Sequence, residues 1–215
     1  RAVKGKGSIT ESHKNDYLLD ATLTYNKTIF GNHNLKVMAG YAYQKFSTEM
    51  LYGYNDHFVS DVFGVNNLQA GGNKTKKVES SKSISKYLSY FGRINYDIAD
   101  KYLFTFTLRA DGSDRFGKDN RTAVFVSGGL SWNIAREYFM RPVTWLSDLK
   151  LKVSVGSTGN AAVGNYGHLA LAGTANYNGT TGWRYAQLPN PDLGWEKQIQ
   201  TNVGISATFF EKLKV

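Results

Sequence analysis

Side chains along much of this chain alternate between apolar and polar with a period of two. Between positions 17 and 26, the residues Tyr17, Leu19, Ala21, Leu23 and Tyr25 share one side, and the residues between them are mostly polar. A period of two places successive side chains on opposite faces of a β-strand. The alternation predicts seven strands: 17–26, 35–44, 88–98, 102–111, 124–134, 149–156 and 198–209. The chain is therefore predicted to be all-β, with a stub of an eighth strand at Lys214–Val215.

The connections between the predicted strands alternate in length. Turns of a few residues follow the first, third and seventh strands, whereas the long loops are expected over 47–83, 111–122 and 157–192. The connection over 135–148 is longer than a simple turn and holds the one predicted helical turn, which Pro142 interrupts. Long loops on one rim and mostly short turns on the other are typical of an outer-membrane β-barrel.

The two faces of the predicted strands need different surroundings. Polar faces such as Lys150 and Lys152, or Gln198 and Gln200, need water or polar partners, because each unsatisfied group costs a few kcal/mol in a dry core. The apolar faces need lipid or a second sheet. A soluble β-sandwich would satisfy the alternation equally well. The strand lengths and the rim asymmetry favour the barrel, because ~9–11 tilted residues cross a bilayer.

Composition excludes several functional classes. The chain has no cysteine, so disulfides and thiol catalysis are excluded. Its net charge of +9 comes from scattered basic residues, so we expect no nucleic-acid partner. The histidines are too far apart in sequence for a metal site, and we expect no metal, no cofactor and no enzyme activity; they are His13, His33, His57 and His168. No apolar run approaches the ~18 residues of a membrane-spanning helix.

An ordered set of short motifs runs through the chain from Tyr87 onward. The motif residues beyond the strands are Asp111, Gly112, Ser113, Arg115, Phe116, Gly117, Gly159, Asn160, Pro189, Asn190, Pro191, Trp195 and Glu196. Together with Tyr90–Tyr96 and Leu149–Ser154, they occur in an order and spacing that resemble the SusC/RagA-like family of TonB-linked outer-membrane transporters. Each motif alone is weak, but the ordered set is specific. The first 80 residues fit this family in pattern rather than in motif.

The resemblance implies a fold, a function and partners. It implies that residues 1–215 form part of one barrel domain of 22 strands, in the bacterial outer membrane. A plug domain and a TonB-contacting segment are expected outside these residues. The implied function is energised import of a bulky nutrient, an oligosaccharide or other glycan or a peptide. The implied partners are membrane lipid, the TonB system and a SusD-like lipoprotein. A soluble β-sandwich that binds carbohydrate is the alternative.

Two groups of side chains are candidates for functional contacts. Aromatic residues in the expected long loops could contact substrate: Tyr52, Tyr54, Tyr166, Tyr177, Trp183 and Tyr185. The alternative for these residues is that the loops pack on their own side chains. Basic residues on the polar faces are expected to face the lumen and hold the plug: Arg93, Arg109, Lys150 and Lys152.

Overall fold

The computed structural model describes residues 5–60, 62–210 and 212–214, and most of its regular structure is β-strand. The strands are β1 (Lys6–Ile29), β2 (His33–Asp56), β3 (Lys77–Ile98), β4 (Tyr102–Ser113), β5 (Thr122–Asn133), β6 (Leu146–Asn160), β7 (Leu171–Tyr177), β8 (Thr180–Gln187), β9 (Glu196–Phe209) and β10 (Leu213–Lys214). Short 3-10 helices form η1 (Gly64–Ala70), η2 (Ile134–Arg136) and η3 (Tyr138–Met140). Within the described residues, no helix is long and apolar enough to cross a membrane.

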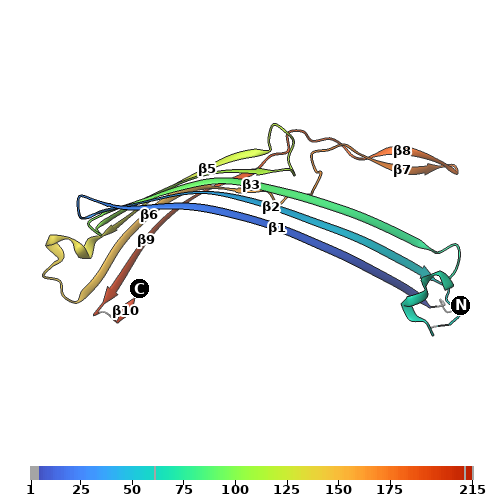
Figure 1. Ribbon diagram of the computed structural model, residues 1–215, viewed down its shortest axis with the longest axis horizontal. Helices are drawn as coiled ribbons and strands as arrows, with labels where there is room; N and C mark the ends of the chain where they lie inside the picture. The colour runs from blue at the N-terminus through green and yellow to red at the C-terminus, as the bar shows by residue number, and fades with distance from the viewer. Residues whose placement is uncertain (1–4, 61, 211, 215) are drawn as a thin grey trace. The chain divides into compact units, whose positions relative to one another are not determined.

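The strands form one large sheet and one separate hairpin (Figure 1). The large sheet has eight strands in the order β1-β2-β3-β4-β5-β6-β9-β10, and β7 pairs only with β8. Strands that are neighbours in this sheet are also consecutive in the chain, except where the hairpin is inserted between β6 and β9. The prediction of seven strands and a stub is confirmed for the sheet, since β10 has two residues. The chain divides into two compact units, one of residues up to Tyr17 with Gln44–Lys86, and one of Leu18–Tyr43 with the residues from Tyr87 onward.

The pairing register confirms the predicted faces. Directly paired residues of an antiparallel sheet point to the same side. One row crosses five strands with apolar side chains only: Tyr96, Phe104, Leu130, Val153 and Val203. The next row crosses the same strands with small and polar side chains: Asn95, Thr105, Gly129, Ser154 and Asn202. In these rows the apolar residues share one face of the sheet and the small and polar residues share the other, and the polar face also carries Phe91, Leu103 and Phe125.

The apolar face has no protein layer on it in the described part of the chain. Leu23 is 76% exposed, Val203 70% and Ile205 71%. A β-sandwich would bury these side chains against a second sheet, because large apolar side chains gain roughly 1.5–3 kcal/mol when they leave water. The only other sheet in the described residues is the β7–β8 hairpin. The structure therefore supports the barrel-wall interpretation and not the sandwich.

Tight turns close three of the hairpins. Both central residues have positive φ at Phe30–Gly31, at Ala99–Asp100 and at Asn178–Gly179. Two consecutive residues in this region are the mark of the type I′ turn, whose twist matches that of the flanking strands. Two of these turns join strands of the large sheet on the rim where short connections were predicted.

Several strands are longer than predicted. β1 and β2 have 24 residues each, and β2 continues to Asp56 through a stretch that was expected to be loop. β3 begins at Lys77, so the predicted loop over 47–83 was wrong at both ends. The predicted loop over 157–192 was also wrong in part, because it contains β7 and β8. Alternation marks a strand only where its two faces meet different surroundings. Both faces are largely exposed in β7, β8 and the start of β3, and both are mostly half-buried in the outer part of β2.

A buried amide organises the β2–β3 connection. Asn55 is fully buried, and its Nδ2 donates to the Leu68 carbonyl at 2.8 Å. Its Oδ1 accepts hydrogen bonds from the Thr75 hydroxyl at 2.7 Å and from the Asp56 backbone N–H at 2.9 Å. Buried polar groups are stable only when they are satisfied in this way. Asn55 therefore fixes the segment that contains η1 against the end of β2.

On the loop side, the pairing of β5 with β6 stops before the end of either strand. The last pair is Ser127 with Gly156, whereas β6 continues beside β9 as far as Asn160 with Glu196. At the point of separation, the Ser157 hydroxyl accepts a hydrogen bond from the Val126 N–H at 3.0 Å and donates one to the Val126 carbonyl at 3.3 Å. A side chain thus replaces a backbone pair at the loop-side end of this ladder.

Candidate functional site

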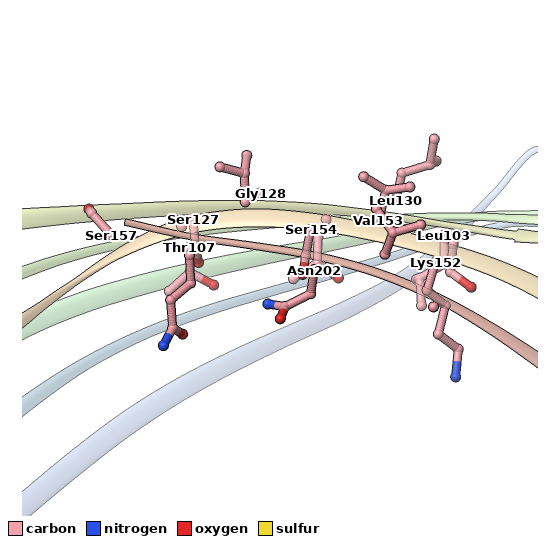
Figure 2. Close-up of a pocket in the computed structure, with 18 of the residues that line it drawn as sticks. Leu103, Thr107, Ser127, Gly128, Leu130, Lys152, Val153, Ser154, Ser157 and Asn202 are labelled. Atoms are coloured by element: carbon pink, nitrogen blue, oxygen red, sulfur yellow. The ribbon is translucent and has the colours of Figure 1, made fainter. Parts of the chain in front are cut away.

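A shallow groove of about 730 Å³ lies along the sheet, lined by residues of β3, β4, β5, β6 and β9. Figure 2 shows Lys152 and Asn202 pointing to one side of the sheet and Leu130 to the other. The polar side of the groove carries mostly hydroxyl and amide side chains: Thr105, Thr107, Ser127, Ser131, Ser154, Gln200 and Asn202. Such a surface can exchange hydrogen bonds with water or with a polar molecule that passes along it.

The four basic residues predicted to face the lumen all lie on the polar face. Arg93 Nε donates to the Thr107 hydroxyl at 3.2 Å, and Lys150 Nζ lies 3.1 Å from Asp148. Lys152 lines the groove. Their placement on this face agrees with the prediction, and their proposed contact with a plug stays a prediction.

Arg109 has the most extensive contacts of these four residues. Its Nε lies 2.6 Å from Asp111 Oδ1, and its Nη2 donates to the Ser89 hydroxyl at 2.9 Å. Its guanidinium also lies 5.6 Å from the centre of the Phe91 ring. Charge-assisted bonds of this kind fix the orientation of an arginine on a surface. Asp111, one of the predicted motif residues, therefore holds the Arg109 side chain through an ion pair within strand β4.

The motif residues come together at the loop-side ends of β4, β5, β6 and β9. Phe116 is fully buried, and its ring centre lies 5.2 Å from that of Trp195. The Trp195 ring meets Phe125 edge-on at 5.7 Å, and its indole N–H donates to the Arg121 carbonyl at 3.1 Å. Phe116, Ala123 and Phe125 are the buried apolar residues of the described chain. We call this group, with Trp195, the aromatic core.

Close backbone contacts hold the two motif loops on each other. A Cβ at Gly117 would lie 2.9 Å from the Pro191 carbonyl oxygen, so any larger residue would push the loops apart. Ser113, which is buried, donates its backbone N–H to the Arg121 carbonyl at 3.0 Å, and its hydroxyl accepts the Arg115 N–H at 3.3 Å. These contacts give the residues Gly112–Gly117 a structural role in closing the β4–β5 loop.

The other motif residues extend the same cluster. Arg115 Nη1 donates to the Ala161 carbonyl at 3.1 Å, and its guanidinium lies 5.5 Å from the centre of the Tyr87 ring. Asn160 Nδ2 donates to Glu196 Oε2 at 3.1 Å. Gly159 lies close to the aromatic core, since a Cβ at this position would be 2.0 Å from the Phe125 ring. The Asn190 N–H donates to the His168 carbonyl at 3.2 Å. The residues Pro189 to Glu196 thus line up along the loop of Gly112–Gly117.

The β7–β8 hairpin presents exposed aromatic rings on both faces. Trp183 pairs with Thr174 and Tyr185 with Ala172, so both rings lie on one face. Tyr177, two residues before Gly179, lies on the opposite face. Trp183 is 80% exposed, Tyr185 72% and Tyr177 87%. Two flat rings next to short polar side chains are suited to contact a sugar face or an extended peptide.

A glutamine fastens the base of this hairpin. Gln187 Nε2 donates to the carbonyls of Tyr166, Gly167 and Leu169, at 3.1, 3.2 and 2.8 Å. In the same turn, His168 Nδ1 lies 3.0 Å from the Arg115 carbonyl. The hairpin is therefore connected to the motif loops through side chains that the sequence motifs did not include.

The six aromatic candidates do not form one site. Tyr52 and Tyr54 lie inside β2, so their predicted place in a loop was wrong. The Tyr54 hydroxyl donates to Asp56 Oδ2 at 3.1 Å. Tyr166 lies in the turn that Gln187 binds. Trp183 and Tyr185 share one face of the hairpin and Tyr177 lies on its other face, whereas Tyr52 and Tyr54 share a face of β2.

Sequence reasoning missed Gln187, His168 and also Glu137, which lies in the β5–β6 connection and accepts hydrogen bonds from the Tyr102 hydroxyl and the Trp132 indole N–H. The first two act through backbone carbonyls, which leave no pattern in the sequence. The Asn178–Gly179 pair was the available signal for the hairpin, since this dipeptide favours a type I′ turn. In the part of the chain that the structure describes, no three His, Asp or Glu side chains lie close enough together to hold a metal ion.

Comparison with known proteins places the fold in a family. The family model described as TonB dependent receptor-like, beta-barrel, matches residues 4–213. The TonB-dependent receptor P3 of Formosa agariphila is 35% identical over 216 residues, which cover 97% of this chain and 21% of that protein. The TonB-dependent receptor SusC of Bacteroides thetaiotaomicron is 41% identical over 137 residues, which cover 57% of this chain and 13% of SusC. The chain thus spans about a fifth of the length of the first of these relatives.

A solved structure shows the same fold. The structure of the RagAB peptide transporter superposes with a TM-score of 0.87 and 34% identity, covering 95% of this chain and 23% of the matched chain. A second structure, of the RagAB peptide importer in its closed-closed state, gives a TM-score of 0.86 at the same identity and covers 94% of this chain. At 34% identity, this chain resembles the matched chains in amino-acid sequence as well as in fold.

Proposed function

Because the chain belongs to the TonB-dependent receptor-like β-barrel family of the outer membrane, we propose that it forms part of the wall of a nutrient importer. Residues 1–215 form one stretch of a single barrel domain, and the plug and the TonB-contacting segment belong to other parts of the transporter. The carrying observation is the sheet itself, whose apolar face is exposed and whose polar face holds the groove. The apolar face meets lipid and the polar face meets the water-filled, plugged lumen.

The imported molecule is bulky, and it is an oligosaccharide or a peptide. SusC and the RagAB peptide importer are among the relatives, and the name of the latter specifies peptides. The exposed rings of Trp183 and Tyr185 on the β7–β8 hairpin support a contact with such a molecule at the loop side. A SusD-like lipoprotein covers the mouth, and the TonB system supplies the energy. Import breaks no covalent bond, so we expect no catalytic residue.

A paired uptake assay tests this proposal. Cells with and without the intact transporter are given a fluorescently labelled oligosaccharide pool and a labelled peptide pool in separate cultures. We expect uptake of one pool to require both the transporter and an intact proton gradient, and a lipoprotein to co-purify with the transporter. If deletion of the transporter leaves the uptake of both pools unchanged, import by this protein is contradicted. Purification without any lipoprotein would contradict the proposed partner alone.

A further inference from the structure

The connection between β5 and β6 lies on the apolar side of the sheet. Its Glu137 carboxylate accepts hydrogen bonds from the Tyr102 hydroxyl at 2.6 Å and from the Trp132 indole N–H at 3.1 Å. Tyr102 and Trp132 are paired across β4 and β5 in the apolar face, with their rings stacked at 6.5 Å. A carboxylate that binds the polar tips of two lipid-facing rings lies at the edge of the lipid-facing surface.

The far end of the same connection is fastened to the same side. The Trp145 ring stacks on Phe209 with ring centres 5.9 Å apart and an angle of 1° between the planes. Phe209 continues the apolar face of β9, after Val203 and Ile205. The backbone of Trp145 also accepts a hydrogen bond from Phe210 at 2.9 Å. The segment between Glu137 and Trp145 therefore runs along the lipid side of the short-turn rim.

The middle of this segment exposes aromatic rings and one arginine. Tyr138 is 75% exposed and Phe139 62%. The Arg141 guanidinium lies over the Tyr138 ring, 4.8 Å from its centre. Two neighbouring cations are already paired, Arg136 with Asp100 and Lys101 with Glu137. Across the described residues, no carboxylate forms an ion pair with Arg141.

We propose that this connection binds an anionic phospholipid of the periplasmic leaflet. Arg141 binds the headgroup phosphate, and the rings of Tyr138 and Phe139 lie among the glycerol and upper acyl groups. Short turns of such barrels face the periplasm, and aromatic rings concentrate at the membrane interface. Basic residues at an interface attract anionic lipids. The proposal rests on the outer-membrane location of the chain and does not depend on what is imported.

Lipid retention by the full transporter tests the proposal. The purified protein is exposed to an equimolar mixture of phosphatidylglycerol and phosphatidylcholine, and the retained lipid is measured by native mass spectrometry. We expect Arg141→Gln to reduce retained phosphatidylglycerol about fivefold, the effect of one basic residue near an anionic surface. Retained phosphatidylcholine should not change. The matched control is Arg121→Gln, which removes an exposed arginine from the loop-side rim and should retain lipid as the unaltered protein does.

Additional variants separate lipid binding from folding and from protein binding. Arg141→Lys keeps the charge and should keep most of the preference, whereas Tyr138→Ala, which removes the ring under the guanidinium, should weaken it. Heat-dependent migration on gels verifies that each barrel is folded. Equal retention by Arg141→Gln and the unaltered protein, or an equal loss in Arg121→Gln, overturns the proposal. So does a result in which Arg141→Gln weakens binding of the periplasmic domain of TonB and leaves lipid retention unchanged.

Discussion

Glu137 shows how one residue can organise a rim. Three donors from two places in the sequence converge on its carboxylate: the neighbours Lys101 and Tyr102, with Lys101 Nζ 2.9 Å away, and Trp132. The Tyr102 hydroxyl is the main cause that lowers the pKa of Glu137 to about 2, with Lys101 and Trp132 adding to it. The polar tips of interfacial rings are thereby satisfied by the protein itself rather than by headgroups or water.

The lowered pKa predicts a pH dependence of barrel stability. A carboxyl group whose pKa is lowered on folding stabilises the fold fully above its unfolded value of 4.5, and this stabilisation is lost as the pH falls through about 2. Thermal unfolding of the transporter in detergent, followed by tryptophan fluorescence, should therefore show a stability loss between pH 4.5 and 2 that Glu137→Gln lacks. Parallel curves for both proteins over this range would contradict the assignment.

Residues in the aromatic core explain why the motifs are spaced as they are. Phe116, Trp195 and Phe125 come from separate stretches, and the Trp195 ring lies against both phenylalanine rings. The resemblance identified Phe116 and Trp195 as motif residues, but not Phe125, and it did not say what they do. Contacts such as Gly117 against Pro191 depend on how the strands bring distant loops together, and no local pattern encodes that.

At the scale of the element, strand β9 has two faces that should tolerate charge differently. Val203 lies on the apolar face, and its chain neighbour Asn202 lies on the polar face. We expect Val203→Lys to lower the free energy of unfolding by ~2–4 kcal/mol if the site lies near the bilayer midplane. Asn202→Lys is the matched control and should cost little. Both are measured by denaturant unfolding in lipid vesicles, and equal costs would argue against the assignment of the faces.

The β7–β8 hairpin offers a second comparison between faces. Trp183→Ala and Tyr185→Ala each remove a ring from the proposed contact surface, and Tyr177→Ala removes an equally exposed ring from the other face. A pair of aromatic rings contributes ~0.5–1.5 kcal/mol beyond area burial, and we expect the loss of one ring contact with the substrate to be of this size. We expect uptake to need several times more substrate in the first two variants and to be unchanged in the third. A loss shared by all three would point to an effect on the hairpin fold.

The strands of the sheet were predictable where lipid and water lie on opposite sides, and less so elsewhere. Side chains along β4, β5 and β9 alternate because the face that carries Phe104, Leu130 and Val203 meets other surroundings than the opposite face. The outer part of β2, around Tyr52 and Tyr54, has no such contrast and was taken for loop. The hairpin was missed for the same reason, and only its Asn178–Gly179 turn carried a local signal.

At the scale of the whole molecule, the sheet has two open edges in the described residues. β1 pairs on one side only, with β2, and β10 pairs only with β9. Unpaired edges and an exposed apolar face both promote association. We expect residues 1–215, expressed alone, to aggregate without detergent and to be dispersed by it, as measured by light scattering. A monodisperse protein in detergent-free buffer would contradict the barrel-wall interpretation and favour a self-contained soluble domain.

The bond between Ser157 and Val126 has a consequence for the loop-side rim of the sheet. On one side of that serine β5 and β6 form a continuous ladder, and on the other side no backbone pair joins these two strands in the described residues. A backbone ladder fixes the register of two strands, because a slip of one residue would turn every side chain to the other face. The ladder therefore sets the alignment of β5 with β6 only up to Ser157, and beyond it side-chain contacts such as that of Phe125 with Gly159 take over this role.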